Sequence, residues 1–197
     1  MLSFNPNEQS ERENYKLLIG TVIPRPIAFV TSVAADGTVN AAPFSYFNIV
    51  SSNPPMLSVS VQRKNGAAKD TARNILEKKE FVVHIVDEEN VYEVNKTAAS
   101  LPPDESEIDL AELALVDSDT VSIPAVKESK ARFECVLEHA VDLGGTDLII
   151  GKIVRFHIDE SIYENGRINA ETLKPVSRLA GTNYAKLGEI FSLKRPK

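Results

Sequence analysis

Apolar side chains recur at every second position along much of the chain, and many of them are β-branched or aromatic. This spacing puts alternate side chains on opposite faces of an extended chain, which is typical of strands with one buried face. The pattern predicts strands over residues 27–33, 39–47, 56–61, 81–86, 131–140 and 147–158. Strands of this number can close a small barrel, so we expect a mostly β fold of about six antiparallel strands.

Short helices are expected between some of these strands. Asp70 has the position of an N-cap for a helix that continues to residue 78, and an acidic run begins a second helix near 91–98. Residues 100–120 are rich in Pro, Asp and Glu, and we interpret them as an excursion with one or two helical turns. The strand pattern resumes after this excursion, so it is not expected to be a domain linker.

Length and composition favour one domain. A chain of 197 residues with 43% hydrophobic content is long enough for one packed core and short for two. We therefore predict a single domain over residues 1–197, with a lead-in over 1–20 and a C-terminal arm over 173–197.

Charge and hydropathy exclude several classes of partner. The formal net charge is −6 and no basic stripe is visible, so nucleic acid is not an expected partner. No apolar run approaches the roughly 20 residues of a membrane-spanning helix, and residues 1–13 are polar. These features predict a cytoplasmic protein without a membrane segment. The single cysteine, Cys135, lies in an alternating segment and is expected to be a buried small side chain.

Most sequence signatures of catalysis are missing from this chain. It has no Gly-x-Gly-x-x-Gly after a strand, no P-loop, no His-Glu-x-x-His and no Gly-x-Ser-x-Gly. The three histidines, His84, His139 and His157, lie in or beside predicted strands and form no pair at the spacing of metal ligands. We therefore expect no metal site.

The segment 63–71 has the pattern of an anion site, because it leaves a strand and enters the N-terminus of a helix. The free amide groups of a first helical turn, the cations of Arg63, Lys64 and Lys69, and the Thr71 hydroxyl could together bind a phosphate group. The alternative is a polar turn whose cations are merely solvated. Asp70 opposes an anion unless its carboxylate caps the helix.

The segment 40–48 could hold a flat ligand. Its small residues leave room beside a strand, and Ser45 and Asn48 offer hydrogen bonds next to aromatic rings. The alternative is an ordinary barrel strand with an edge proline at Pro43.

In their order along the chain, these segments resemble the flavin-reductase-like, FMN-binding split-barrel family from about Tyr15 to Leu187. The stretches that carry the resemblance are residues 24–33, the turn at 36–37, and residues 40–48, 53–55, 69–74 and 175–184. The resemblance implies a Greek-key-like split β-barrel with a few short peripheral helices. It also implies a homodimer that binds FMN non-covalently at or near its interface.

The resemblance also implies which residues bind the cofactor. Four would border the isoalloxazine ring and three would lie beneath it: Ser45, Tyr46, Phe47 and Asn48, then Ser60, Val61 and Gln62. Lys69, Asp70 and Thr71 would meet the phosphate, Arg178 and Tyr184 belong to the C-terminal arm, and Thr31 and Ser32 are further candidates. No catalytic side chain is named, because the N5 atom of the flavin carries the chemistry in such proteins.

One departure from the family keeps two functions open. Many relatives have a histidine just before the strand that ends in Ile-Gly-Lys/Glu-Val, where this chain has Gly144-Gly-Thr-Asp147 leading into that strand. The first function is an FMN-dependent oxidoreductase, an NAD(P)H-dependent flavin reductase that passes electrons to a second flavin or another acceptor. The second is an FMN-binding electron carrier or flavin sensor without nicotinamide turnover. A ligand-free structural barrel is a third reading.

Overall fold

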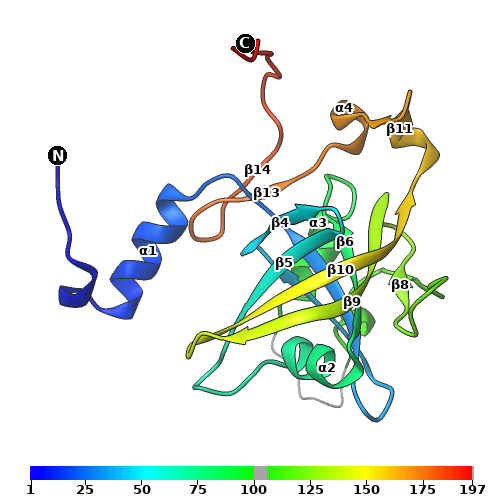
Figure 1. Ribbon diagram of the computed structural model, residues 1–197, viewed down its shortest axis with the longest axis horizontal. Helices are drawn as coiled ribbons and strands as arrows, with labels where there is room; N and C mark the ends of the chain where they lie inside the picture. Colours follow the sequence, from blue (N-terminus) through cyan, green and yellow to red (C-terminus); the bar gives the residue numbers. More distant parts are fainter. Residues whose placement is uncertain (100–105, 197) are drawn as a thin grey trace.

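The computed structural model of the chain describes residues 1–99 and 106–196. Within them, seven antiparallel strands form the main sheet, in the order β3-β2-β6-β9-β10-β5-β4 (Figure 1). Their bounds are β2 Ala28–Val33, β3 Val39–Phe44, β4 Phe47–Ser52, β5 Pro55–Gln62, β6 Glu80–Ile85, β9 Ala131–Asp142 and β10 Thr146–Ile158. The predicted mostly β fold is confirmed, with seven strands in this sheet in place of about six.

The sheet curls so that its two ends approach each other. β3 and β4 lie at opposite ends of the strand order, although only Ser45 and Tyr46 separate them along the chain. β3 also contacts β5, the strand next to β4. The result is a split barrel, as the resemblance implies.

The expectation of one continuous strand over 39–47 is wrong. Phe44 pairs with Ala28 of β2, whereas Phe47 pairs with Val59 of β5. The chain therefore changes partner strand between these two residues, and the change ends one strand and begins the next.

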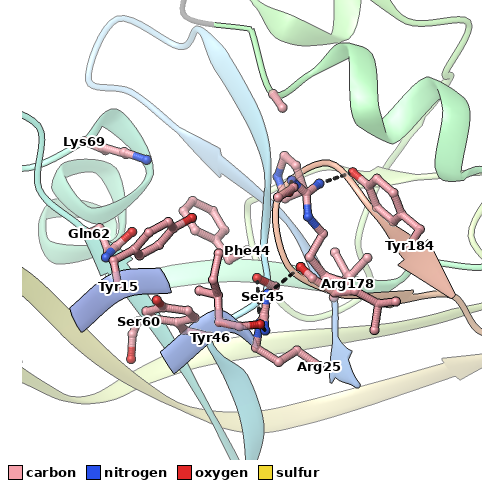
Figure 2. Close-up of a pocket in the computed structure, with 16 residues that line it drawn as sticks. Tyr15, Arg25, Phe44, Ser45, Tyr46, Ser60, Gln62, Lys69, Arg178 and Tyr184 are labelled. Atoms are coloured by element: carbon pink, nitrogen blue, oxygen red, sulfur yellow. Dashed lines mark hydrogen bonds between the residues drawn. The ribbon is translucent and has the colours of Figure 1, made fainter. Parts of the chain in front are cut away.

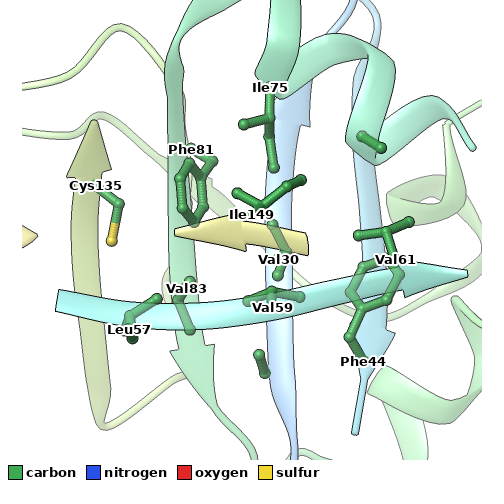
Figure 3. Close-up of a cluster of buried hydrophobic side chains, with 12 residues drawn as sticks. Val30, Phe44, Leu57, Val59, Val61, Ile75, Phe81, Val83, Cys135 and Ile149 are labelled. Atoms are coloured by element: carbon green, nitrogen blue, oxygen red, sulfur yellow. The ribbon is translucent and has the colours of Figure 1, made fainter. Parts of the chain in front are cut away.

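The core of the barrel follows the period of two. In β5, Leu57, Val59 and Val61 are buried, whereas the serines between them face the other side. Figure 3 shows these valines packed against Phe81, Ile149 and other apolar side chains from across the sheet. Cys135 belongs to this cluster and is fully buried, so its predicted structural role is confirmed. Full burial of each valine, leucine, isoleucine or phenylalanine side chain in this cluster contributes about 1.5–3 kcal/mol to stability.

Helix α2, Asp70–Lys78, lies against β2 and β3 and buries Ala72 and Ile75 in the same core. Asp70 is not the N-cap that the sequence predicted. Lys69 has extended backbone angles, with φ −70° and ψ 159°, and is the N-cap, while Asp70 is the first helical residue and forms an ion pair with Arg73.

The region after β6 holds short elements. Helix α3 spans Val91–Lys96, two residues shorter than expected. In the predicted excursion over 100–120, residues 100–105 lie outside the described residues, and the part that follows forms a 3-10 turn, η2 Glu107–Leu110, and strand β7 Leu115–Val116. β7 pairs with β8 Ala125–Val126, which follows the excursion.

The two terminal segments extend away from the barrel (Figure 1). The expected lead-in contains a helix that was not predicted, α1 Glu11–Thr21, whose N-terminus is closed by a capping box of Ser10 and Glu13. Ile19 is its buried residue. In the C-terminal arm, β13 Ser177–Arg178 pairs with β1 Arg25–Pro26 and with β14 Tyr184–Ala185.

A few more short elements occur among the described residues. They are η1 Pro6–Glu8, η3 Glu160–Ile162, β11 Tyr163–Glu164, β12 Arg167–Ile168 and α4 Ala170–Leu173. Among the described residues, every helix is too short or too polar to span a bilayer.

Candidate functional site

A cavity of about 320 Å³ lies where α1, the outer face of β5, the β3–β4 connection and the C-terminal arm meet. Figure 2 shows Lys69 and Gln62 toward one end and Arg178 and Tyr184 toward the other, with Tyr15 of α1 on the side of Lys69 and Gln62. Its polar and aromatic lining residues are Tyr15, Arg25, Phe44, Ser45, Tyr46, Ser60, Gln62, Lys69, Arg178 and Tyr184.

A second cavity of about 540 Å³ adjoins the first at the N-terminus of α2. The two cavities share Pro43, Phe44, Lys69 and Ala98 in their linings. Lys69 therefore lies where the two cavities meet. The first cavity is lined by aromatic and hydroxyl-bearing side chains, and the second ends at the N-terminus of α2.

Arg25 joins three of the elements that form the first cavity. Its guanidinium donates hydrogen bonds to the carbonyls of Ile19 at 2.9 Å and Val22 at 2.8 Å, at the end of α1, and to the carbonyl of Leu179 at 2.9 Å in the arm. Its Nε also donates to Ser45 Oγ at 3.4 Å. Arg25 is not among the site residues predicted from the sequence, although it lies in the segment 24–33 that carries the family resemblance.

Arg178 and Tyr184 form one unit at the other end of the cavity. The guanidinium of Arg178 donates to the Tyr184 hydroxyl and to the carbonyl of Gly181, each at 2.5 Å. The Tyr184 hydroxyl donates in turn to Asn95 Oδ1 of α3 at 3.0 Å. This chain of contacts fixes the hairpin of the arm against the barrel.

The cations predicted for the anion site do not all face the second cavity. Arg63 donates from Nε at 3.0 Å and from Nη2 at 2.6 Å to the carboxylate of Asp147, and it also forms an ion pair with Asp142 at 2.9 Å. The hydrogen bond to Asp147 raises the pKa of Arg63 above its ordinary value. Arg63 is therefore committed to its acidic neighbours, whereas Lys69 is exposed at the junction of the cavities.

The structure brings most of the candidate site residues together. Ser45, Tyr46, Ser60, Gln62, Lys69, Arg178 and Tyr184 line the first cavity, and Lys69, Asp70 and Thr71 line the second. Five candidates within the described residues lie outside both linings: Thr31, Ser32, Phe47, Asn48 and Val61.

These five residues have other contacts. Val61 is buried in the core and Phe47 packs against it. Thr31 is fully buried and its hydroxyl donates to the carbonyl of Pro124 at 2.7 Å. Ser32 is also fully buried, and Asn48 is exposed on the edge strand β4.

Both ring nitrogens of His84 have structural partners. His84 is fully buried, its Nδ1 lies 2.9 Å from the carbonyl of Phe29, and its Nε2 accepts the amide of Val126 at 2.9 Å. Burial lowers the pKa of His84 to about 4, although the hydrogen bond to Phe29 opposes this shift. His139 is exposed on β9.

His157 lies 2.6 Å from Glu134, and with Asp119 these residues place possible metal-ligand atoms within 4.8 Å of one another. The carboxylate of Glu134 already accepts the amides of residues 119, 120 and 121. Burial raises the pKa of Glu134, but these amides and His157 outweigh burial and lower it to about 2. Both carboxylate oxygens of Glu134 therefore already have hydrogen-bond partners within the protein.

Comparison with known proteins identifies the family. The model of the family described as "Flavin reductase like domain" matches residues 19–173. The chain belongs to this flavin reductase-like family. The match begins within α1 and ends with α4, so Arg178 and Tyr184 lie beyond it.

Three solved structures are similar over most of this chain. Nitrilotriacetate monooxygenase component B from Bacillus cereus is 62% identical, with a TM-score of 0.97 and 98% of each chain covered. The 2-nitrobenzoate 2-nitroreductase of Pseudomonas fluorescens is 29% identical, with a TM-score of 0.90, over 99% of this chain and 96% of its own. Flavoredoxin of Desulfovibrio vulgaris (Miyazaki F) is 25% identical, with a TM-score of 0.78, over 87% and 91%.

Proposed function

We propose that this protein is a flavin reductase that binds FMN non-covalently, takes reducing equivalents from NAD(P)H and passes them to a second flavin or another acceptor. The observation that carries the proposal is the pair of adjoining cavities that meet at Lys69. The second cavity has the N-terminus of α2 and the cation of Lys69 at its boundary, and the first has aromatic rings and small polar groups. An elongated ligand with one anionic end and one flat aromatic end matches both.

The phosphate end is assigned to the first turn of α2 and Lys69. The first amides of a helix lack intrahelical acceptors and point out of the helix, so they bind anions, and the helix dipole adds to this attraction. α2 is nine residues long, and its N-cap Lys69 lines both cavities.

The ring end is assigned to the first cavity. Hydrogen-bonding groups come from Ser45 in the β3–β4 connection and from Ser60 and Gln62 in β5. Aromatic surface comes from Tyr15 and Tyr46. The amide of Ser60 donates to the carbonyl of Tyr46 at 2.8 Å, so the β3–β4 connection is fixed to β5. A pocket held in this way is pre-organised for a flat ligand.

When bound, FMN supplies the redox chemistry, because its N5 atom accepts a hydride from a nicotinamide. The side chains of this protein have to bind and orient the ligand and leave one face of its ring open. Arg25 orients Ser45 and holds α1 and the arm beside the cavity. Side chains with these tasks need no acid–base triad, and the buried His84 remains part of the core.

The test is the visible spectrum of the purified protein with FMN, followed by steady-state oxidation of NADH and NADPH. We expect bound flavin absorption and flavin-dependent turnover. The variant Lys69→Gln should weaken FMN binding by roughly tenfold, whereas Lys78→Gln at the opposite end of the same helix should change it by less than about twofold. Absence of flavin binding and of flavin-dependent turnover would exclude the proposal.

A second candidate function is that of an FMN-binding electron carrier or flavin sensor. It is favoured by the β9–β10 turn, where Gly144 and Gly145 stand near the position at which many relatives have a histidine. It is also supported by the similarity to a flavoredoxin. Bound FMN that dithionite reduces but NADH and NADPH do not would select this function over the first.

We further propose that the protein acts as a cytoplasmic homodimer with the flavin site at or near the interface. α1 exposes Leu17 and Leu18, and the end of the C-terminal arm exposes Ile190, Phe191 and Leu193. Apolar side chains on extended segments are covered most simply by a second copy of the chain. Sedimentation equilibrium of the full chain and of a chain ending at residue 173 tests this, since the shorter chain should lose both dimerisation and FMN affinity.

A further inference from the structure

The side chain of Asn40 connects three elements at the phosphate end of the site. The Thr71 hydroxyl, in the first turn of α2, donates to Asn40 Oδ1 at 2.7 Å. Asn40 Nδ2 donates to Glu107 Oε2 of η2, also at 2.7 Å. The exposed fractions of these three residues are 8% for Asn40, 2% for Thr71 and 8% for Glu107. This cluster of polar groups is therefore nearly removed from water.

Glu107 decides how these groups are oriented. A carboxylate accepts hydrogen bonds, so it faces the amino group of Asn40, and the carbonyl oxygen of that amide must then face Thr71. The same carboxylate oxygen accepts the backbone amide of Ala41 at 3.2 Å, which fixes it to β3. Thr71 consequently donates its only hydroxyl proton into the protein. This corrects the expectation that the Thr71 hydroxyl is a phosphate donor.

The cluster continues beneath α2. Ser32 Oγ lies 3.4 Å from Asn40 Oδ1 and accepts a hydrogen bond from Asn74 Nδ2 at 3.2 Å. Thr71 and Asn74 are on the same face of α2, three residues apart, and both are 2% exposed. Two points of α2 are thus attached to β3 and β2 through polar groups, and the hydroxyls of Thr71 and Ser32 both donate to Asn40 Oδ1.

We propose that Glu107 is a positioning residue of the flavin site: through Asn40 it holds the first turn of α2 so that its amide groups face the cavity beside Lys69. The inference rests on the proposed FMN binding. Glu107 itself lines the cavity at the α2 N-terminus and carries a negative charge. Its geometric role and its charge act in opposite directions on a bound phosphate.

These opposite signs make the role measurable. If Glu107 acted by its charge alone, any variant without the carboxylate would bind FMN more tightly. If it acts by position, a variant that keeps the charge and shortens the side chain will bind FMN more weakly. Glu107→Asp keeps the charge and removes one methylene of reach, whereas Glu107→Gln removes the charge and keeps an oxygen that can accept from Asn40 and Ala41.

The experiment measures the dissociation constants of FMN and riboflavin for the full chain by flavin fluorescence. Riboflavin has no phosphate, so it reports on the ring end of the site. We expect Glu107→Asp to weaken FMN five- to tenfold and riboflavin less than twofold, a loss of about one or two buried hydrogen bonds. We expect Glu107→Gln to bind FMN within twofold of the unmodified chain or more tightly.

Ser106→Ala is the matched control. Its hydroxyl donates to the carbonyl of Val39 at 2.6 Å and so attaches the same segment without contacting Asn40. This variant should leave the ratio of FMN to riboflavin affinity unchanged. A ratio that falls equally in Ser106→Ala and Glu107→Asp would overturn the proposal, because general loosening of the segment would then be sufficient.

Two other results would also overturn it. One is a Glu107→Asp variant that binds both flavins as tightly as the unmodified chain, and the other is an equal loss for FMN and riboflavin. An unmodified chain that binds neither flavin would instead refute the proposed function, so the two failures are distinguishable. Both substitutions at Glu107 are conservative, and circular dichroism of each variant checks that it is folded.

Discussion

The guanidinium carbon of Arg178 lies 4.6 Å from the centre of the Tyr184 ring, across the short β13–β14 hairpin. The same guanidinium donates to the Tyr184 hydroxyl, which is bonded to Asn95 of α3. A cation over an aromatic face and a shared hydrogen bond reinforce each other. The cavity wall at this end therefore depends on a residue pair in the arm, and this pair is bonded to α3 through Asn95.

The first prediction concerns this wall. Arg178→Ala should weaken FMN binding by roughly tenfold, because it removes the cation–π contact and two hydrogen bonds that hold the hairpin. Arg167→Ala, an exposed arginine of β12, is the control and should change binding by less than about twofold. Isothermal titration with FMN gives both values. Equal binding by the two variants would show that the arm does not contribute to the site.

The second prediction concerns a close approach in the core. A Cβ atom added at Gly151 of β10 would lie 2.3 Å from Cζ of Phe81 and 3.3 Å from Cβ of Cys135. Phe81 is fully buried, so its ring cannot move without disturbing the core. Gly151→Ala should lower the free energy of unfolding by about 1–3 kcal/mol, measured by urea denaturation.

Two further variants test the cause. Gly145→Ala should be close to neutral, because a Cβ there meets nothing within 4 Å. In the double variant with Phe81→Leu, the cost of Gly151→Ala should shrink, because the ring atoms that cause the clash are gone. If the two substitutions were simply additive, the clash would not be the reason for the loss.

The third prediction concerns pH. The folded pKa of His84 is about 4, below its ordinary value of 6.5, because the ring is buried. Between these two values the unfolded chain binds a proton that the folded chain does not, so the contribution of His84 to stability falls as the pH falls from 6.5 to 4.

Urea denaturation at pH 7 and pH 5 measures this effect. Between these pH values, His84 should account for a loss of about 2 kcal/mol in the free energy of unfolding. The variant His84→Gln does not titrate, so its own loss over the same interval should be smaller by that amount. An identical pH dependence in both proteins would contradict a buried neutral imidazole.

The fourth prediction separates two cations of the segment 63–71. Arg63→Gln should lower the melting temperature, because Asp147 is largely buried and loses its partner, and it should leave FMN affinity within about twofold. Lys69→Gln should do the reverse, weakening FMN with little effect on the melting temperature. Calorimetry and FMN titration of both variants check this. Weaker FMN binding by the folded Arg63 variant would return Arg63 to the phosphate site.

The sequence predicted strand bounds well where a single run of alternating apolar residues forms a single strand. The expected strand 56–61 corresponds to β5, Pro55–Gln62, and 147–158 corresponds to β10, Thr146–Ile158. The break between β3 and β4 could not be predicted, because it is set by a change of partner strand from β2 to β5 that only the fold shows. Helix α1 did have a local signal, the Ser-x-x-Glu pattern at its N-terminus.

The candidate site was recovered in part. Short segments with a family pattern led to Ser45, Tyr46 and Lys69, which the structure brings to one pair of cavities. Arg25 was missed because its function depends on carbonyl groups as far away in the chain as Leu179. Glu107 was missed because an acidic residue in an acidic segment is ordinarily solvated, and only the fold shows that its carboxylate is enclosed.

Ser45 and Tyr46 join strands from opposite ends of the sheet, and this connection limits how the protein can change. The three steps from Phe44 to Phe47 span at most about 11 Å, so the barrel edges cannot separate there without unfolding a strand. The barrel side of the cavity is therefore fixed in width. Room for a bulkier electron acceptor has to come from α1 or the C-terminal arm, and relatives with different acceptors should differ first in those two segments.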